Sequence, residues 1–235
     1  MKEFANSKEE IVATPQKTFD NFNEFIFSND TKILAKLVAR TSLINSVSTI
    51  PGDIVECGVF KGSGIITWLK LKKILYPNSF KKIIGFDMFD DEKLISMLHN
   101  EDKEMMAKLF SSRSFKYDES YREHLIKILE TAGFYNDFDF ELIKGDVSET
   151  TKTYSDDRIG AKISLLYMDL DLGEPTYNVL KNLWNKVSRG GMVVFDEYGY
   201  HQWSETIGVD KFVEEYGLTI NTLDYQAPTA YIVKV

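Results

Sequence analysis

The sequence predicts a doubly wound α/β fold with a mostly parallel sheet, and two observations support this. From residue 51 onward, short apolar runs of strand length alternate with segments of helical periodicity. An acidic residue stands near the end of four of these runs: Glu56, Asp87, Asp169 and Asp196. Parallel strands end at a common edge of the sheet, and open α/β sheets bind ligands there, so we expect a site at that edge.

The expected elements follow a regular order along the chain. Two helices between residues 19 and 47, separated at residues 28–30, precede the sheet, and the polar residues 1–14 are expected to be mobile. Strands are expected at 54–58, 82–86, 138–143, 163–168 and 192–195, with strand-like runs at 218–223 and 230–235. Helices are expected at 65–75, 118–131, 174–187 and 204–216. The chain therefore divides into an N-terminal helical extension, residues 1–50, and one domain, residues 51–235.

The segment 88–116 interrupts this alternation. It is long, charged and rich in methionine, with one helix expected near 91–110. Connections of this length in compact domains are usually functional or flexible. We expect a lid-like insertion, and a passive insertion is the alternative.

Composition restricts the class of protein. The hydrophobic fraction of 43% across 235 residues is enough to form a core. The net charge of −8 disfavours nucleic acid and anionic membranes as partners, because phosphate binding depends on clustered Lys and Arg. A single cysteine, Cys57, argues against a disulfide framework, and no stretch approaches the ~18 apolar residues of a membrane helix. These features favour a cytoplasmic protein, with neither a signal peptide nor a membrane span expected.

The first motif is the glycine-containing turn ECGVFKGSG at residues 56–64, which joins a strand to a helix. Glycine permits a tight turn and the close approach of a ligand, and the helix start offers free N–H groups. The pattern resembles the first motif of class I methyltransferases, and the alternative is a tight turn without a ligand. The resemblance implies that S-adenosylmethionine contacts residues of this turn, namely Glu56, Gly58, Phe60, Gly62 and Ser63.

Two further motifs follow the next strands. Asp87 closes the second strand, where a carboxylate can accept hydrogen bonds from ribose hydroxyls; the alternative is a helix N-cap. Asp146 and Val147 follow Gly145 after the third strand. In the methyltransferase superfamily such a Gly-Asp pair contacts the adenine, whereas the alternative is an ordinary turn.

The fourth motif consists of YMDLDLGEPT at 167–176 followed by GGMVVFDEY at 190–198. With these residues the chain resembles the macrocin O-methyltransferase family of sugar-modifying enzymes over residues 50–215. The resemblance implies a Rossmann-like, mostly parallel seven-stranded sheet. It also implies that Asp169 is both a metal ligand and the catalytic base beside the cofactor, and that Asp196 and Glu197 complete a Mg²⁺ site.

Three positions depart from the family pattern. Glu197 replaces an Asp, DMF at 87–89 replaces D-S-F, and GEPT at 173–176 replaces Y-x-S-T, which bears on metal geometry and acceptor contacts. Asp171 is a weaker ligand candidate. His201 follows the acidic pair and is a candidate auxiliary base, with an ordinary surface histidine as the alternative.

We therefore expect a Mg²⁺-dependent O-methyltransferase that acts on a hydroxyl of a sugar or sugar-containing metabolite. Two alternatives stay open: an enzyme for catechol-type or other small acceptors, and a non-catalytic S-adenosylmethionine-binding protein of the same fold. Aromatic residues of the first helices either cover the acceptor site or form the contact of a homo-oligomer: Phe19, Phe22, Phe25 and Phe27.

Overall fold

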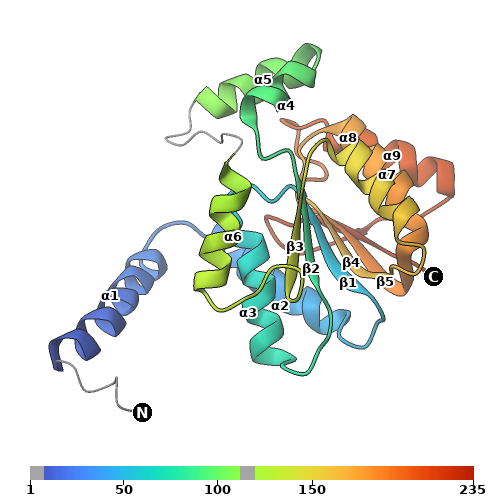
Figure 1. Ribbon diagram of the computed structural model, residues 1–235. Helices are drawn as coiled ribbons and strands as arrows, with labels where there is room; N and C mark the ends of the chain where they lie inside the picture. The colour runs from blue at the N-terminus through green and yellow to red at the C-terminus, as the bar shows by residue number, and fades with distance from the viewer. Residues whose placement is uncertain (1–7, 112–119) are drawn as a thin grey trace.

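The computed structural model describes residues 8–111 and 120–235, with side chains described for 16–99, 102–111 and 120–235 (Figure 1). Its strands form one sheet in the order β3-β2-β1-β4-β5-β7-β6. They are β1 Asp53–Cys57, β2 Ile83–Asp87, β3 Phe140–Lys144, β4 Ile163–Met168, β5 Val187–Phe195, β6 Asn221–Thr222 and β7 Ala230–Val233. The first five are parallel, and β7 runs antiparallel to both β5 and β6. The predicted Rossmann-like, mostly parallel seven-stranded sheet is confirmed.

Helices cover both faces of this sheet (Figure 1). They are α1 Lys8–Ile26, α2 Lys32–Ser46, α3 Ser63–Leu75, α4 Asp91–Met97, α5 Asn100–Ser111, α6 Tyr121–Thr131, α7 Val147–Asp157, α8 Gly173–Leu183 and α9 Glu205–Tyr216, with a short 3₁₀ helix, η1, at Trp184–Lys186. Helices α2, α3 and α6 lie on one face and α7, α8 and α9 on the other, whereas α1 extends away from the sheet (Figure 1).

The core consists of two apolar clusters separated by the sheet. In β4, Leu165 and Tyr167 face the cluster of α2, α3 and α6, whereas Leu166 and Met168 face the cluster of α7, α8 and α9. Successive side chains of a strand point to opposite faces, so a strand covered on both sides is apolar throughout. This is why β4 reads as a continuous apolar run in the sequence.

Several elements differ from the sequence prediction. Helix α1 begins at Lys8 although a mobile tail was expected through residue 14. The insertion holds two helices, α4 and α5, because Leu98 between them takes an extended conformation. Helix α7 was not expected, and β5 begins at Val187, the last residue of the helix expected at 174–187, and not at residue 192. Residues 112–119, part of the predicted insertion and of the helix expected at 118–131, lie outside the described residues.

Strand register brings the polar strand ends together. Met168 of β4 pairs with Cys57 of β1 on one side and with Phe195 of β5 on the other. Consequently the Asp169 N–H donates to the Cys57 carbonyl at 2.9 Å, and the Asp196 N–H donates to the Met168 carbonyl at 2.9 Å. The carboxyl ends of β1, β4 and β5 therefore lie side by side.

Candidate active site

Five carboxyl groups gather at the ends of β4 and β5. Asp169 and Asp171 follow β4, Asp196 and Glu197 follow β5, and Glu205 begins α9. The Glu197 N–H donates to Glu205 Oε1 at 3.3 Å, which ties the last of these to the strand end. Burial and the neighbouring Asp196 raise the pKa of Asp169 to about 7. Burial, and then the charge of Asp169, likewise raise the pKa of Asp171 and of Glu205, because close carboxylates disfavour one another's ionisation.

Two lysines of α2 face these carboxylates. Lys36 Nζ lies 2.7 Å from Asp196 Oδ2 and 3.3 Å from Asp169 Oδ2, while Lys32 Nζ lies 3.0 Å from Glu197 Oε1. Burial would lower the pKa of Lys36, but the carboxylates of Asp169 and Asp196 outweigh it and raise that pKa above its ordinary value. Lys36 is therefore a charged group held between two strand ends.

Arg40, one further turn along α2, pairs with Glu56 inside the protein. Arg40 Nη2 lies 3.7 Å from Glu56 Oε1, and Trp68 Nε1 donates to Glu56 Oε2. Glu56 is 2% exposed, and a Cβ on Gly64 would lie 1.9 Å from Glu56 Oε1. Glu56, expected to contact the cofactor, thus lies beneath the turn, where it anchors the start of α3 to α2.

Two aromatic side chains, Trp68 and Tyr167, pack against Arg40, and Tyr167 connects it to the acidic cluster. The guanidinium carbon of Arg40 lies 4.8 Å from the ring centroid of Tyr167 and 5.3 Å from that of Trp68. The Tyr167 hydroxyl donates to Asp196 Oδ1. Burial and the adjacent Asp196 raise the pKa of Tyr167, which keeps this donor protonated and fixes the orientation of the Asp196 carboxylate.

The glycine turn is built by close contact between strand ends. Gly58 has a φ of +92°, and a Cβ there would lie 1.8 Å from the Asp169 carbonyl oxygen. Gly62, at φ +83°, precedes α3, and its Cβ would meet Leu125 of α6 at 2.5 Å. Both positions require glycine for the backbone itself.

Asp87 holds the same turn from the neighbouring strand. Its Oδ2 accepts from the N–H groups of Val59 at 2.7 Å and Phe60 at 2.9 Å, and its Oδ1 accepts from Phe89 at 2.8 Å. Phe60 has a φ of +50°, a conformation rarely adopted by non-glycine residues, and these bonds stabilise it. The alternative of an N-cap for the next helix is wrong for Asp87, because Asp90 caps α4.

The third predicted motif lies beside the second. The Gly145 N–H donates to the Asp87 carbonyl at 2.9 Å, and Asp146 caps α7 by accepting from the Ser148 N–H at 2.9 Å. Val147 is 8% exposed and joins the second apolar cluster. The three predicted cofactor motifs therefore lie at neighbouring strand ends, β1, β2 and β3.

The carboxylate oxygens at the ends of β4 and β5 are of the chemical type that binds a hard cation. Mg²⁺ prefers carboxylate oxygens, and Glu197 Oε2 and Glu205 Oε2 are buried without a hydrogen-bond partner, which costs free energy that a cation would offset. The arrangement itself is not a preformed metal site: across residues 8–111 and 120–235, no group of three or more His, Cys, Asp or Glu side chains is placed to hold a metal ion. Instead, the ammonium group of Lys32 pairs with Glu197 and that of Lys36 pairs with Asp196.

The insertion packs over the same edge. Met106 and Phe110 of α5 form a third apolar cluster with Leu172, against which Trp203 also packs. Asp102 of this insertion accepts a hydrogen bond from the Ser204 hydroxyl at 2.8 Å, at the start of α9. His201, by contrast, is exposed in the turn between β5 and α9.

Close helix packing explains why residues 173–176 differ from the Y-x-S-T of the family pattern. A Cβ on Gly173 would lie 2.7 Å from the Ser204 carbonyl, and a Cβ on Gly208 would lie 2.0 Å from the Gly173 carbonyl. Helices α8 and α9 therefore approach each other closely at this point, and the Gly173 N–H donates to the Ser204 hydroxyl at 2.8 Å.

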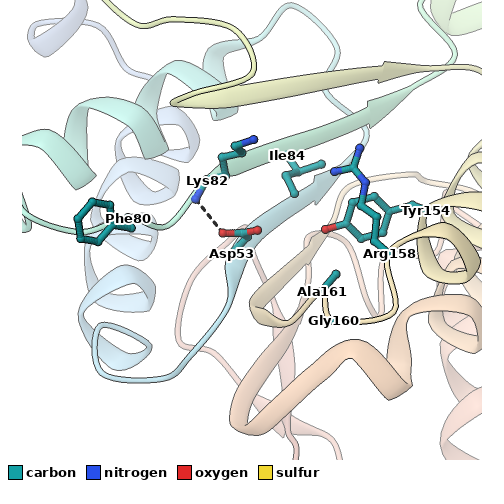
Figure 2. A pocket seen from close by; sticks show the side chains of 8 residues that line it. All are labelled: Asp53, Phe80, Lys82, Ile84, Tyr154, Arg158, Gly160 and Ala161. Atoms are coloured by element: carbon teal, nitrogen blue, oxygen red, sulfur yellow. Dashed lines mark hydrogen bonds between the residues drawn. The ribbon is translucent and has the colours of Figure 1, made fainter.

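A cavity of about 410 Å³ lies at the opposite edge of the sheet (Figure 2). Its wall includes Asp53, the first residue of β1, which accepts a hydrogen bond from the Lys82 N–H at 2.8 Å, together with Tyr154 and Arg158 of α7 and its C-cap (Figure 2). It shares no residue with the carboxylate cluster, and we assign it no role.

In the described part of the chain, no helix combines the length and apolar character needed to cross a bilayer.

The sequence prediction missed the basic side chains of α2. Lys32, Lys36 and Arg40 are spaced by four residues, which places them on one face of a helix. That spacing was the available signal, but the apolar residues between them indicated only an amphipathic helix. Glu205 was also missed, because an acidic residue in the first turn of a helix is commonplace.

Comparison with known proteins agrees with this geometry. Residues 32–231 match the model of the macrocin-O-methyltransferase (TylF) family. A curated relative, demethyldecarbamoylnovobiocin O-methyltransferase of Streptomyces niveus, is 24% identical over 161 residues, which cover 64% of this chain and 54% of the relative. The chain thus spans about half the length of that relative.

Solved structures share the fold. The calicheamicin methyltransferase CalS11 superposes with a TM-score of 0.74 at 24% identity, covering 97% of this chain and 93% of that one. The O-methyltransferase NovP superposes with a TM-score of 0.66 at 21% identity, covering 86% of this chain and 80% of that one. Another CalS11 structure, described as a TDP-rhamnose 3'-O-methyltransferase, has a TM-score of 0.72 at 24% identity, with 97% and 95% coverage.

Proposed function

Because this chain belongs to the macrocin-O-methyltransferase (TylF) family, we propose that it transfers the methyl group of S-adenosylmethionine to a hydroxyl of a sugar or sugar-containing metabolite. One observation carries the proposal: the glycine turn after β1 touches the acidic end of β4, with the Asp169 N–H bonded to the Cys57 carbonyl at 2.9 Å. A methyl donor at the turn and a hydroxyl at Asp169 would therefore be neighbours. The description of CalS11 as a TDP-rhamnose 3'-O-methyltransferase supports this class of acceptor, and the curated relative is likewise an O-methyltransferase.

The cofactor would lie along the ends of β1, β2 and β3. We assign its contacts to Gly58, Phe60, Gly62, Ser63, Asp87, Asp146, Val147 and Asp169. Asp87 has committed both oxygens to backbone N–H groups, but each carboxylate oxygen can accept more than one hydrogen bond, so ribose hydroxyls can add to them. Glu56 supports this surface from beneath through Arg40 and Trp68.

Asp169 is the proposed base. With a pKa raised to about 7 by burial and by Asp196, its carboxylate suits general-base catalysis near neutral pH. The acceptor hydroxyl gives its proton to Asp169, and its oxygen forms a bond to the methyl carbon. The bond between that carbon and the sulfonium sulfur breaks, and its electron pair stays on sulfur, leaving S-adenosylhomocysteine. The fold contributes by aligning oxygen, carbon and sulfur.

We include Mg²⁺ in the proposal, with Asp169, Asp196 and Glu197 as its ligands. When bound, the ion would polarise the acceptor oxygen as a Lewis acid. The buried Oε2 of Glu205, which has no hydrogen-bond partner among the described residues, supports a cation at this edge. A chelator should then abolish turnover while S-adenosylmethionine binding survives, and Glu197→Asp should keep activity because it restores the residue of the family pattern.

Full turnover in chelator would remove Mg²⁺ from the proposal. If Asp169→Asn were also active, the exposed His201 would be the remaining candidate base. Its substitution, His201→Gln, should then lower turnover, whereas in the Asp169 mechanism it should change turnover little.

The acceptor class can be tested directly. Purified protein is incubated with S-adenosylmethionine and either sugar nucleotides, glycosylated metabolites or catechols, and products are identified by mass. Methylation of a sugar hydroxyl supports the proposal, whereas preferred methylation of catechols contradicts the acceptor class. Binding of S-adenosylmethionine without any product, across the panel and with Mg²⁺ present, would indicate a non-catalytic binding protein.

The proposal also includes a cytoplasmic location and a homo-oligomeric state. A cytoplasmic location is supported by Cys57, a buried free thiol, because thiols stay reduced in the cytosol. A homo-oligomer is supported by large apolar side chains that α1, α2 and their connection leave exposed, namely Phe19, Phe22, Ile26, Phe27, Ile33, Leu34 and Val38. Light scattering of purified protein should give at least a dimer, and a monomer at micromolar concentration would contradict this second statement.

A further inference from the structure

Two buried side chains, Glu56 of β1 and Tyr167 of β4, lie next to each other on the same face of the sheet. The two residues are register partners in the parallel pair of β1 and β4, and both are at most 2% exposed. Gly58 and Asp169 follow two positions further along, just beyond the two strand ends. Glu56 and Tyr167 therefore lie one level beneath the place where the glycine turn meets Asp169.

Arg40 of α2 contacts both of these buried side chains. Its Nη2 lies 3.7 Å from Glu56 Oε1, and its guanidinium carbon lies 4.8 Å from the ring centroid of Tyr167. The ring of Trp68, whose Nε1 donates to Glu56 Oε2, lies 5.3 Å away on α3. One guanidinium group, only 7% exposed in its side chain, thus contacts residues of β1, β4 and α3.

The spacing of α2 against the sheet explains this placement. Four residues of a helix rise about 6 Å, and two residues of a strand rise about 6.6 Å. Residues i and i+4 of α2 therefore match residues two apart near the end of β4. Lys36 lies level with Asp169, 3.3 Å from its Oδ2, and Arg40 lies level with Tyr167. Helix α2 and strand β4 run in opposite directions, which brings Arg40 beneath the site.

Stability alone does not account for a buried arginine at this position. Buried ion pairs are often no more stabilising than apolar side chains of similar volume. The pair with Glu56 is also loose, because 3.7 Å exceeds hydrogen-bond distance and Arg40 Nε has no hydrogen-bond partner among the described residues. A planar guanidinium is suited instead to contact a carboxylate and aromatic rings at the same time.

We propose that Arg40 is a positioning residue for methyl transfer, which holds the cofactor turn, through Glu56, and the acceptor edge, through Tyr167, in a fixed relation. This inference rests on the methyl-transfer clause of the proposed function and makes no use of its metal clause. The Tyr167 hydroxyl donates to Asp196 Oδ1, so the hold extends to the end of β5. Donor and acceptor meet across this junction, and a misplacement of about 1 Å in such an alignment can lower a rate by about 10²-fold.

The cofactor turn keeps its own conformation without Arg40. Asp87 holds it from the neighbouring strand by accepting from the N–H groups of Val59 and Phe60. Loss of the Arg40 contacts should therefore leave the turn able to bind S-adenosylmethionine but loosen its placement against Asp169. A lower kcat with an almost unchanged affinity for the cofactor separates this role from a purely structural one.

The test compares Arg40→Lys with a matched control, Arg158→Lys. Lysine keeps the charge that the buried Glu56 requires, but it loses the plane that contacts the rings. Arg158 has the same kinds of partner at the opposite edge of the sheet, since it pairs with Glu141 and lies 4.6 Å from the ring centroid of Tyr154. With a sugar nucleotide that the native protein methylates, kcat of Arg40→Lys should fall at least ~10-fold. Its affinity for S-adenosylmethionine, measured by calorimetry, should change little, and Arg158→Lys should match the native protein in both.

Hydrogen exchange of the ligand-free protein gives a readout that needs no turnover. The Asp169 N–H, bonded to the Cys57 carbonyl, lies at the junction. Arg40→Lys should therefore speed exchange in residues 56–60 and 167–170 and leave β3 at the native rate, whereas Arg158→Lys should leave the junction unchanged. If circular dichroism shows that Arg40→Lys does not fold, the double variant Arg40→Met/Glu56→Gln, which removes both charges together, takes its place.

The outcomes separate the two proposals. An unchanged kcat in folded Arg40→Lys would refute the role in methyl transfer and leave the proposed function intact. Exchange that speeds up equally in β3 and at the junction would show that Arg40 only stabilises the whole fold, which also refutes the inference. If the native protein methylates no acceptor, the proposed function is wrong, and the exchange comparison still decides whether Arg40 holds the junction.

Discussion

Replacing Gly58 by alanine should destabilise the whole protein before it affects any ligand. The added Cβ would lie 1.8 Å from the Asp169 carbonyl oxygen, which is backbone and cannot rotate away, and the residue keeps a φ of +92°. The backbone conformation alone costs about 1–2 kcal/mol for a residue with a side chain. Separating β1 from β4 weakens the hydrogen bond from the Asp169 N–H to the Cys57 carbonyl, which is worth about 1 kcal/mol, so a total destabilisation of about 2–3 kcal/mol is expected.

Gly133→Ala isolates the conformational part of this cost. Gly133 has a φ of +84°, but a Cβ there would meet nothing within 4 Å. The free energies of unfolding of both variants, measured by urea denaturation, should differ by about 1 kcal/mol or more. Equal destabilisation would refute the contact argument. A side chain at Gly58 would therefore meet the protein backbone before it met a ligand.

Three other outcomes are expected. Asp87→Ala should weaken S-adenosylmethionine binding measured by calorimetry, because it releases the N–H groups of Val59 and Phe60; unchanged affinity would contradict this assignment. The hydrogen bonds from Arg158 lower the pKa of Glu141, so this pair stabilises the fold above the unfolded pKa of Glu141, and the stabilisation is lost as pH falls through the lowered value. Glu141→Gln should therefore lower the free energy of unfolding by about 0.5–1 kcal/mol at pH ~7 and by almost nothing at pH ~2, as measured by thermal unfolding. An equal loss of stability at both pH values would contradict the pairing. If residues 88–116 form a lid, hydrogen exchange should slow there when cofactor and acceptor bind, and equal exchange would favour a passive insertion.

The sequence predicted the sheet and its acidic edge because both depend on local patterns. Apolar runs define strands, and a parallel sheet aligns the residues that follow them, so Asp169 and Asp196 could be placed together without coordinates. The same reasoning found the turn at Gly58 and the Gly145 turn next to Asp87.

What was missed depends on long-range packing. Lys36 reaches Asp169 across 133 positions of sequence, and helical spacing alone cannot indicate which face of α2 turns inward. The burial of Glu56 follows from Arg40 and Trp68, which come from two different helices. The sequence prediction also lacked helix α7: Asp146 belongs to a Gly-Asp turn that resembles a ligand motif, but it is also the residue that caps that helix.

The most direct test of the central claim follows an isotopic methyl group. S-adenosylmethionine with a deuterated methyl is incubated with a sugar nucleotide panel, and products of native protein and of Asp169→Asn are analysed by mass spectrometry and fragmentation. We predict a deuterated methyl on a sugar hydroxyl with native protein, and a rate lower by ~10²–10⁴-fold with folded Asp169→Asn, the usual loss when a general base is removed. Transfer to nitrogen or carbon, or an unchanged rate in Asp169→Asn, would contradict it.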